Sequence, residues 1–192
     1  MGMKQTLEVI SEMEAAGVIG RYAISGAVAA FNYVEAAVTE DLDILIAFDR
    51  GAVEGSSGLI SLTPIYSYLR SKGYEEHRKE GIVVGGWPVQ FLPVADALDA
   101  EALAQAQEIE VKFGEIEGAL KTRILRPEHL VAIALRVGRP KDSIRVAQFV
   151  EEGVVDMSVL CDILDRHNLS ATWRGYCARV GIENPCPVRG VL

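Results

Sequence analysis

Two aspartates, two residues apart, are the side chains best suited to chemistry in this 192-residue chain. Asp41 and Asp43 stand at the start of the apolar run "DLDILIAF". Because residues two apart on a strand face the same way, this spacing predicts both carboxylates on one face. Two neighbouring carboxylates repel each other at neutral pH unless a cation lies between them or one is protonated. The pair therefore predicts a cation site, and Mg²⁺ is favoured because it prefers hard oxygen ligands.

A Ser-Gly turn precedes this strand by about fifteen residues and is a candidate phosphate site. "RYAIS" predicts a short strand over 21–25 that ends at Gly26, and "AVAAFNYV" predicts a helix after it. Backbone N–H groups at Ser25 and Gly26, at the start of a helix, would bind phosphate well. A phosphate cradle beside a carboxylate pair is chemically coherent. Alone, however, paired acids at the start of a strand are more often structural than catalytic.

Periodicity and turn residues predict the elements that must position these groups. A hairpin is expected around Gly85 and Gly86, and Trp87 beside it is either a core side chain or a wall over a nucleotide base. Alternation over 108–118 indicates a strand or a hairpin. Helices are expected over 4–16, 62–73 and 96–107 and in succession from 127, with Asp96 or Asp99, Asp156 and Ser170 as caps.

Composition predicts an α+β fold, with an α/β domain over 1–118 and a helical C-terminal part over 119–192. Hydrophobic residues make up 49% of the chain, which is enough for a core. No apolar run approaches the ~18 residues of a membrane span, and no signal sequence is recognisable, so we expect no membrane and a cytoplasmic protein. The cysteines, Cys161, Cys177 and Cys186, are then expected to be reduced thiols.

The charge of the chain is unevenly distributed. The net charge of −8 argues against broad coating by nucleic acid. Residues 121–145, however, hold seven Lys or Arg against two Asp or Glu, a local net charge of +5. Such a segment is either a basic face for the phosphates of a small ligand or a short RNA, or a set of solvated helix faces.

The stretch "SGAVAAFNYVEAAVTEDLDILI" resembles the signature of the minimal nucleotidyltransferases, which include the type IV abortive-infection toxins of bacteria. Ser25 and Gly26 match its glycine pair, Thr39 its threonine, and Asp41 and Asp43 its two acids. The resemblance continues in the predicted C-terminal helices. There "GRPKDSIRV" is similar to an Arg-x-Lys-Asp element of that family, matched by Arg139, Lys141 and Asp142.

The resemblance implies a nucleotidyltransferase-like mixed β-sheet flanked by helices, with a helical C-terminal tail. It implies transfer of a nucleotidyl group from a Mg²⁺-bound nucleoside triphosphate to a hydroxyl of an RNA or protein acceptor, and an antitoxin partner if the protein is toxin-like. Asp41 and Asp43 would hold the metal and act in catalysis. The substrate-binding residues would be Ser25, Gly26, Thr39, Gln90, Arg139, Lys141 and Asp142.

The chain departs from the family pattern at the third carboxylate. The family has this acid on a later central strand, and the matching position in "PVQFLPV" is the neutral Gln90. Asp96 and Glu80 are the candidates to replace it. Ala37 stands where the family has an arginine, and the turn reads Ser-Gly rather than Gly-Ser. The alternative is therefore an impaired nucleotidyltransferase-fold protein that binds a nucleotide or a partner; an Asp-x-Asp glycosyltransferase fits less well, because the chain is short.

Overall fold

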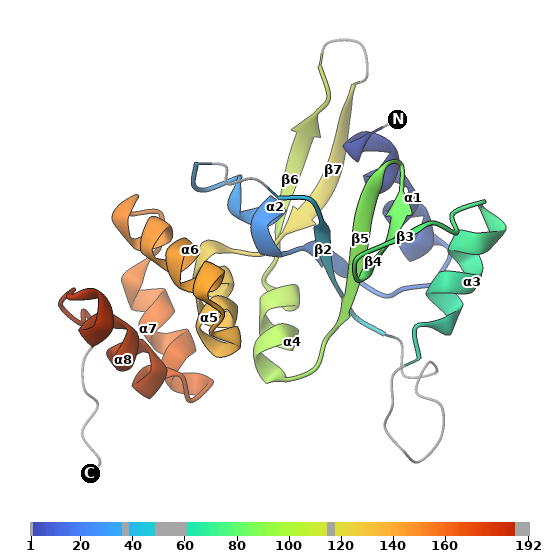
Figure 1. Ribbon diagram of the computed structural model, residues 1–192. Coiled ribbons are helices and arrows are strands. Elements are labelled where there is room, and N and C mark those ends of the chain that lie inside the picture. Colours follow the sequence, from blue (N-terminus) through green and yellow to red (C-terminus); the bar gives the residue numbers. More distant parts are fainter. Residues whose placement is uncertain (1, 36–38, 49–60, 115–117, 187–192) are drawn as a thin grey trace. The chain divides into compact units, whose positions relative to one another are not determined.

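The computed structural model describes residues 2–35, 39–48, 61–114 and 118–186 (Figure 1). Ala37, which replaces the family arginine, lies outside the described residues. The chain forms two compact units, each with its own packing. The first consists of Met1–Ala29 with Ala37–Leu125, and the second consists of Ala30–Ala36 with Arg126–Leu192.

One mixed sheet is the centre of the first unit, and the described residues contribute seven strands to it. These are β1 (Tyr22–Ile24), β2 (Leu42–Ile46), β3 (His77–Arg78), β4 (Gly81–Val84), β5 (Trp87–Pro93), β6 (Gln107–Lys112) and β7 (Ala119–Ile124). Their order across the sheet is β3-β4-β5-β2-β1-β7-β6. Strand β2 is antiparallel to β1 and parallel to β5, while β1 is parallel to β7. The predicted mixed sheet flanked by helices is confirmed.

Strand β2 lies in the middle of the sheet, and its residues other than Asp43 are buried. Burial on both faces explains the unbroken apolar sequence that follows Asp43. The unit also contains α1 (Met3–Ala15), α3 (Thr63–Ser71) and α4 (Ala97–Ala104), and the short α2 begins in it (Gly26–Ala30). Helix α1 buries Leu7, Ile10 and Met13 at helical spacing. Each such side chain contributes about 1.5–3 kcal/mol when it is fully buried.

The hairpin predicted at Gly85 and Gly86 is confirmed. Val84 of β4 pairs with Trp87 of β5, so the loop has only these two glycines. Their φ angles are +59° and +94°, which a two-residue hairpin loop of this kind requires and which glycine adopts without steric cost. The hydroxyl of Thr6 donates to the Val84 carbonyl at 2.7 Å and ties α1 to the hairpin.

Four helices make up most of the second unit: α5 (Pro127–Val137), α6 (Pro140–Glu151), α7 (Met157–Arg166) and α8 (Ser170–Val180). Asp156 caps α7 as predicted, and its side chain accepts from the amides of Ser158 and Val159. Ser170 was predicted as a cap, but it is the first helical residue of α8, and Leu169 occupies the cap position. Residues 119–124, which composition assigned to the helical part, form strand β7 of the sheet.

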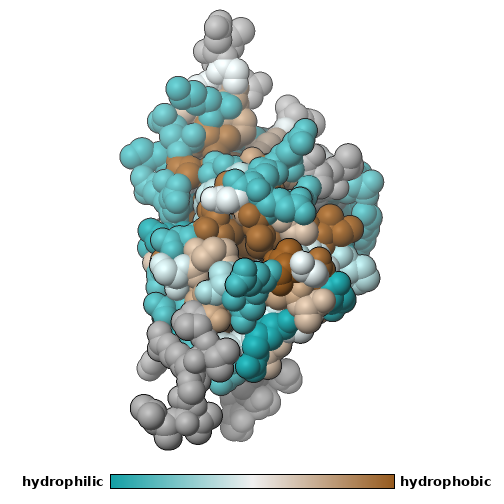
Figure 2. Space-filling view, turned by 90° about the vertical axis from the view of Figure 1, so that its left-hand side faces the viewer, coloured by the Kyte–Doolittle hydropathy of each residue, from teal (hydrophilic) through white to brown (hydrophobic). Residues whose placement is uncertain are grey.

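The surface of the molecule is mixed in character, and Figure 2 shows apolar (brown) and hydrophilic (teal) residues interspersed over the viewed face. The large apolar side chains that are exposed in the described part of the chain all belong to the second unit: Val137, Ile144, Val180 and Ile182. Among the described helices, none is both long and apolar enough to cross a bilayer.

The expectation of three reduced thiols is wrong for one pair. Cys161 of α7 and Cys186 near the C-terminus form a disulfide, and Cys177 is a buried free cysteine. The two bonded cysteines are 25 residues apart, and no spacing motif marks such a pair in the sequence. Only the packing of the C-terminal segment against α7 brings them together.

This pairing predicts the thiol count of the unfolded, unreduced protein. With the disulfide formed, Ellman's reagent in denaturant should titrate one thiol per chain, that of Cys177. After reduction and removal of the reductant, the same assay should titrate three. Three thiols before reduction would contradict the disulfide.

Candidate functional site

Asp43 lies between two neighbouring strands, and β1 approaches it from one side. Ile24 pairs with Ile44, and the Ser25 amide donates to the Asp43 carbonyl at 2.8 Å. A Cβ atom on Gly26 would lie 1.9 Å from Oδ2 of Asp43. The carboxylate therefore rests directly against the backbone of the Ser-Gly turn, at a residue with φ of +60°. The structure thus brings together the predicted phosphate turn and the second predicted acid.

Helix α2, which follows this turn, is shorter than the sequence predicts. It ends at Ala30, after five residues. A helix of little more than one turn has a small macrodipole, so the dipole contributes little to anion binding. Any affinity of the turn for phosphate would therefore come from its individual N–H groups and from a nearby cation.

Asp41 directly precedes β2 and is oriented by Thr39. The Thr39 hydroxyl donates to Oδ1 of Asp41 at 2.9 Å and lies 3.3 Å from the Asp41 carbonyl oxygen. Both side chains are half-buried. Thr39 was predicted to bind substrate. In the structure its hydroxyl fixes one oxygen of Asp41, and its role in substrate binding stays a prediction.

Gln90 lies on the other side of Asp43. Strands β2 and β5 are parallel, and Asp43 is directly opposite Gln90 in their register. Paired residues of adjacent parallel strands project to the same face, so the sequence placed the third position correctly. The Nε2 group of Gln90 donates to Oε2 of Glu80 at 2.9 Å.

The structure distinguishes the two acids that could replace the missing carboxylate. Asp96 accepts from the Asp99 amide at 2.9 Å and caps α4. Glu80, in the turn between β3 and β4, reaches the site through Gln90. Within the described part of the chain, no three Asp, Glu, His or Cys side chains converge closely enough to form a metal cluster.

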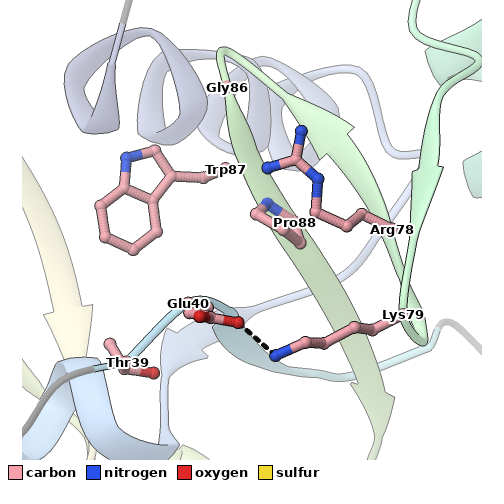
Figure 3. A pocket seen from close by; sticks show the side chains of 7 residues that line it. All are labelled: Thr39, Glu40, Arg78, Lys79, Gly86, Trp87 and Pro88. Carbon is pink, nitrogen blue, oxygen red and sulfur yellow. Dashed lines mark hydrogen bonds and ion pairs between the residues drawn. The ribbon is translucent and has the colours of Figure 1, made fainter.

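A pocket of about 440 Å³ opens at the ends of β2 and β5 where these strands begin (Figure 3). Trp87 and Pro88 supply apolar walls, and Arg78 and Lys79 supply cations. Pro88 is two residues before Gln90, so both project to the same face of β5. The complete lining is Thr39, Glu40, Arg78, Lys79, Gly86, Trp87 and Pro88. The pocket therefore adjoins the residues that precede Asp41.

An ion pair spans this pocket, as the dashed line in Figure 3 shows. Nζ of Lys79 lies 2.5 Å from Oε2 of Glu40. The hydrogen bond and the opposite charge hold the pKa of Glu40 below its usual range and raise that of Lys79. Both side chains are largely exposed, so the pair contributes little to stability and a charged ligand could displace it. Lys79 also has a φ of +54°, which is uncommon for a residue other than glycine.

Arg78, Lys79 and Glu40 line this pocket but were not predicted as site residues from the sequence. A signal did exist, because "HRKEG" sets two cations beside the acid Glu80 and directly before a predicted strand. The pocket itself left no such signal, since its walls come from segments about forty residues apart.

The Arg-x-Lys-Asp element belongs to the second unit, where it starts α6. Nε of Arg139 donates to Oδ2 of Asp142 at 2.8 Å, and the Arg139 amide donates to the same oxygen at 3.2 Å. Asp142 is almost completely buried, so it serves the start of this helix. Lys141, by contrast, is exposed in the first turn.

The basic segment 121–145 is divided between the two units. At least four of its seven cations form ion pairs among the described residues: Lys121 with Glu108, Arg123 with Glu14, and both Arg139 and Arg145 with Asp142. Much of the local charge seen in the sequence is thus neutralised by neighbouring carboxylates.

The donor set at the start of β2 fits a magnesium ion. Mg²⁺ is usually held by one or two carboxylates, with waters and substrate phosphates completing its shell. Asp41 and Asp43 supply the carboxylates, and the amide oxygen of Gln90 is a neutral donor. The approach of Asp43 to Gly26 places the carboxylate beside backbone amides that could meet a phosphate.

No protein-family model matches the chain, and no curated protein sequence matches it. Among solved structures, it is similar to an antigenic nucleotidyltransferase-like protein from Paracoccidioides brasiliensis, with 15% identity over 88% of this chain and 90% of that one and a TM-score of 0.48. It is also similar to ANT(2″)-Ia in complex with adenylyl-2″-tobramycin, with 16% identity over 93% and 99% and a TM-score of 0.43. A solution structure of the antibiotic-resistance factor ANT(2″)-Ia gives 15% identity over 91% of each chain and a TM-score of 0.41. At these identities and TM-scores, no residue role is transferred from these structures to this chain.

The contact between Gly26 and Asp43 predicts the effect of a single added methyl group. Gly26→Ala should weaken Mn²⁺ binding about 10- to 100-fold, because the new Cβ would displace the Asp43 carboxylate, and displaced ligand orientation typically costs this much. Calorimetric titration with Mn²⁺ measures the effect. Gly17→Ala is the control, since Gly17 also has a positive φ, +70°, but open space around its Cβ position. Equal Mn²⁺ affinity in the two variants would refute the role of this close approach.

Proposed function

We propose that this protein is a Mg²⁺-dependent nucleotidyltransferase that transfers a nucleotidyl group from a nucleoside triphosphate to a hydroxyl acceptor. The observation that supports this most is the setting of Asp43. Its carboxylate lies against the Ser-Gly turn on one side, and its register partner Gln90 lies on the other. A carboxylate that could hold a cation, the Ser-Gly turn and the amide side chain of Gln90 thus meet at one end of the central strands.

Asp41 and Asp43 would hold the ion, which when bound supplies positive charge to the phosphate oxygens. The Gly26 amide would receive the triphosphate and orient it, while the Ser25 amide bonds to the Asp43 carbonyl. In the reaction, a bond forms between the acceptor oxygen and the α-phosphorus. The bond to the pyrophosphate oxygen breaks, and the hydroxyl proton leaves with a base or solvent. Gln90 cannot take that proton, because a neutral amide is not a base at neutral pH.

The pocket beside Asp41 suits the acceptor. An in-line displacement requires the attacking oxygen to approach from the side opposite the leaving group. With pyrophosphate at the Ser-Gly turn, the acceptor would then lie on the side of β5, where Trp87, Arg78 and Lys79 line the cavity. A flat aromatic wall with two cations and one carboxylate favours an acceptor that carries a base or a phosphate, as RNA does, over a polycation.

A protein acceptor and a toxin–antitoxin setting extend the proposal by the sequence resemblance alone, whereas the lining of the pocket also favours RNA. A role for the element at the start of α6 likewise rests on the resemblance alone. There Lys141 is exposed, while Arg139 and Asp142 bond to each other.

A specific observation favours a second candidate, a module that binds nucleotide without turnover. Gln90 occupies the place of a carboxylate, and the described residues form no three-acid cluster. Calorimetry with Mg²⁺–ATP and the other triphosphates separates the two. When the same triphosphates are then incubated with RNA, protein and small-molecule acceptors, binding without release of pyrophosphate supports the module, and binding with release supports the enzyme.

Transfer can be tested directly with the four α-labelled nucleoside triphosphates and total RNA, total protein and small-molecule hydroxyl acceptors. Asp43→Asn should lower transfer at least about 100-fold, since it removes charge from the metal-holding pair. Asp165→Asn, at an exposed position on α7, should leave transfer unchanged. No transfer by the wild type, or equal transfer by the Asp43 variant, would sink the proposal.

The role of the pocket predicts an effect confined to the acceptor. Trp87→Ala should raise the KM for the acceptor about tenfold, because loss of a stacking wall costs about 1–3 kcal/mol, and should leave the KM for the triphosphate nearly unchanged. Trp87→Phe should restore most of the affinity by keeping an aromatic face. A rise in the triphosphate KM alone would place the nucleotide, rather than the acceptor, in this pocket.

A further inference from the structure

We propose that Glu80 is a positioning residue that acts through Gln90, so that the two side chains together replace the missing third carboxylate; this inference rests on the proposed function. Gln90 supplies an oxygen on the face of Asp43, and Glu80 supplies the negative charge behind it. The observation is the hydrogen bond from Nε2 of Gln90 to Oε2 of Glu80, at 2.9 Å.

This hydrogen bond determines which end of the amide faces the site. A carboxylate only accepts hydrogen bonds, so only the NH₂ end of Gln90 can lie against Glu80. The amide oxygen, Oε1, is then directed away from Glu80, on the face of β5 that Gln90 shares with Asp43. Without Glu80, the two ends of the amide could exchange in the free protein, and cation binding would then have to fix the orientation of the amide.

The charge of Glu80 also changes how strongly Oε1 of Gln90 would bind a cation. A hydrogen bond to an ionised acceptor is stronger than a neutral one, and it polarises the amide that donates it. Polarisation increases the negative partial charge on Oε1. A neutral side chain can in this way approach the behaviour of a weak anionic ligand.

The backbone brings Glu80 to this position. Gly81, the next residue, is buried at the start of β4, and a Cβ there would lie 2.9 Å from the carbonyl oxygen of Val89 and 3.0 Å from its nitrogen. Glycine therefore lets the β3–β4 turn lie directly on β5, one residue from Gln90. The neighbouring Lys79 forms an ion pair with Glu40, which directly precedes Asp41. The β3–β4 turn therefore has one contact beside Asp41 and one with Gln90, the register partner of Asp43.

The prediction concerns Mn²⁺ as a probe without nucleotide. Glu80→Gln should weaken Mn²⁺ binding about tenfold, the lower end of the effect of removing a group that orients a metal ligand. Glu75→Gln is the control, because it removes an equal charge from an exposed position in the same segment. Calorimetry or the electron paramagnetic resonance of free Mn²⁺ measures the affinity, and unchanged thermal unfolding midpoints verify folding.

An exchange of the two side chains makes the test sharper. Gln90→Glu alone sets two carboxylates at hydrogen-bond distance, where they repel, and should not improve Mn²⁺ binding. The double variant Glu80→Gln, Gln90→Glu restores one donor and one carboxylate and should recover at least the wild-type affinity. Gly81→Ala, which displaces the turn without changing charge, should resemble Glu80→Gln.

The outcomes separate this inference from the proposed function. Full Mn²⁺ affinity in Glu80→Gln, with label transfer by the wild type, overturns the role of Glu80 and leaves the enzyme standing. Loss and recovery of Mn²⁺ binding in the single and double variants, without transfer by the wild type, supports the role of Glu80 and contradicts the enzyme. No Mn²⁺ binding by the wild type overturns the role of Glu80 as a group that acts on a cation.

Discussion

The position of Asp43 on the central strand is the constraint on which the rest of the site depends. Its backbone carbonyl accepts from Ser25, its carboxylate lies against Gly26, and its register partner is Gln90. Strand β2 is buried apart from this residue, so the hydrophobic core fixes the height and direction of the carboxylate. A slip of β2 by one residue would turn Asp43 to the opposite face of the sheet. It would also move Leu42 and Ile44 to the face that Asp43 occupies in the structure. The register of β2 therefore determines both the packing of the core and the position of the Asp43 carboxylate.

Several charged side chains lie close to the start of β2, and their placement limits the repulsion among the carboxylates. Two carboxylates at the start of β2 are costly without a cation, and a third beside them would increase the repulsion. An amide at position 90 avoids that cost in the absence of metal, while Glu80 keeps a negative charge one hydrogen bond away and more exposed to water. The ion pair between Lys79 and Glu40 similarly limits the excess of negative charge beside Asp41.

The turn between β3 and β4 joins the candidate metal site and the candidate acceptor pocket. Consecutive residues, Arg78, Lys79 and Glu80, contribute two cations to the pocket and one carboxylate to Gln90. A ligand that displaces Lys79 from Glu40 would act on the same turn that orients Gln90. Residues 78–81 thus connect the pocket with the residues around Asp43, because the turn lies directly on β5 at Gly81.

Much of the architecture follows from the sequence by itself. Hydrophobic runs, the Gly85-Gly86 loop and the cap at Asp156 determine the strands near the site, the hairpin and most helices, because these depend on local periodicity and backbone preference. The pairing of Asp43 with Gln90 was also predictable, through resemblance of the two strands to a known signature. Only the tertiary structure showed that Glu80 bonds to Gln90 while Asp96 caps α4, that Thr39 bonds to Asp41, and that Cys161 is joined to Cys186. Those outcomes depend on which segments, distant in the sequence, meet in the fold, as Gly81 meets Val89. Local sequence patterns do not specify such contacts.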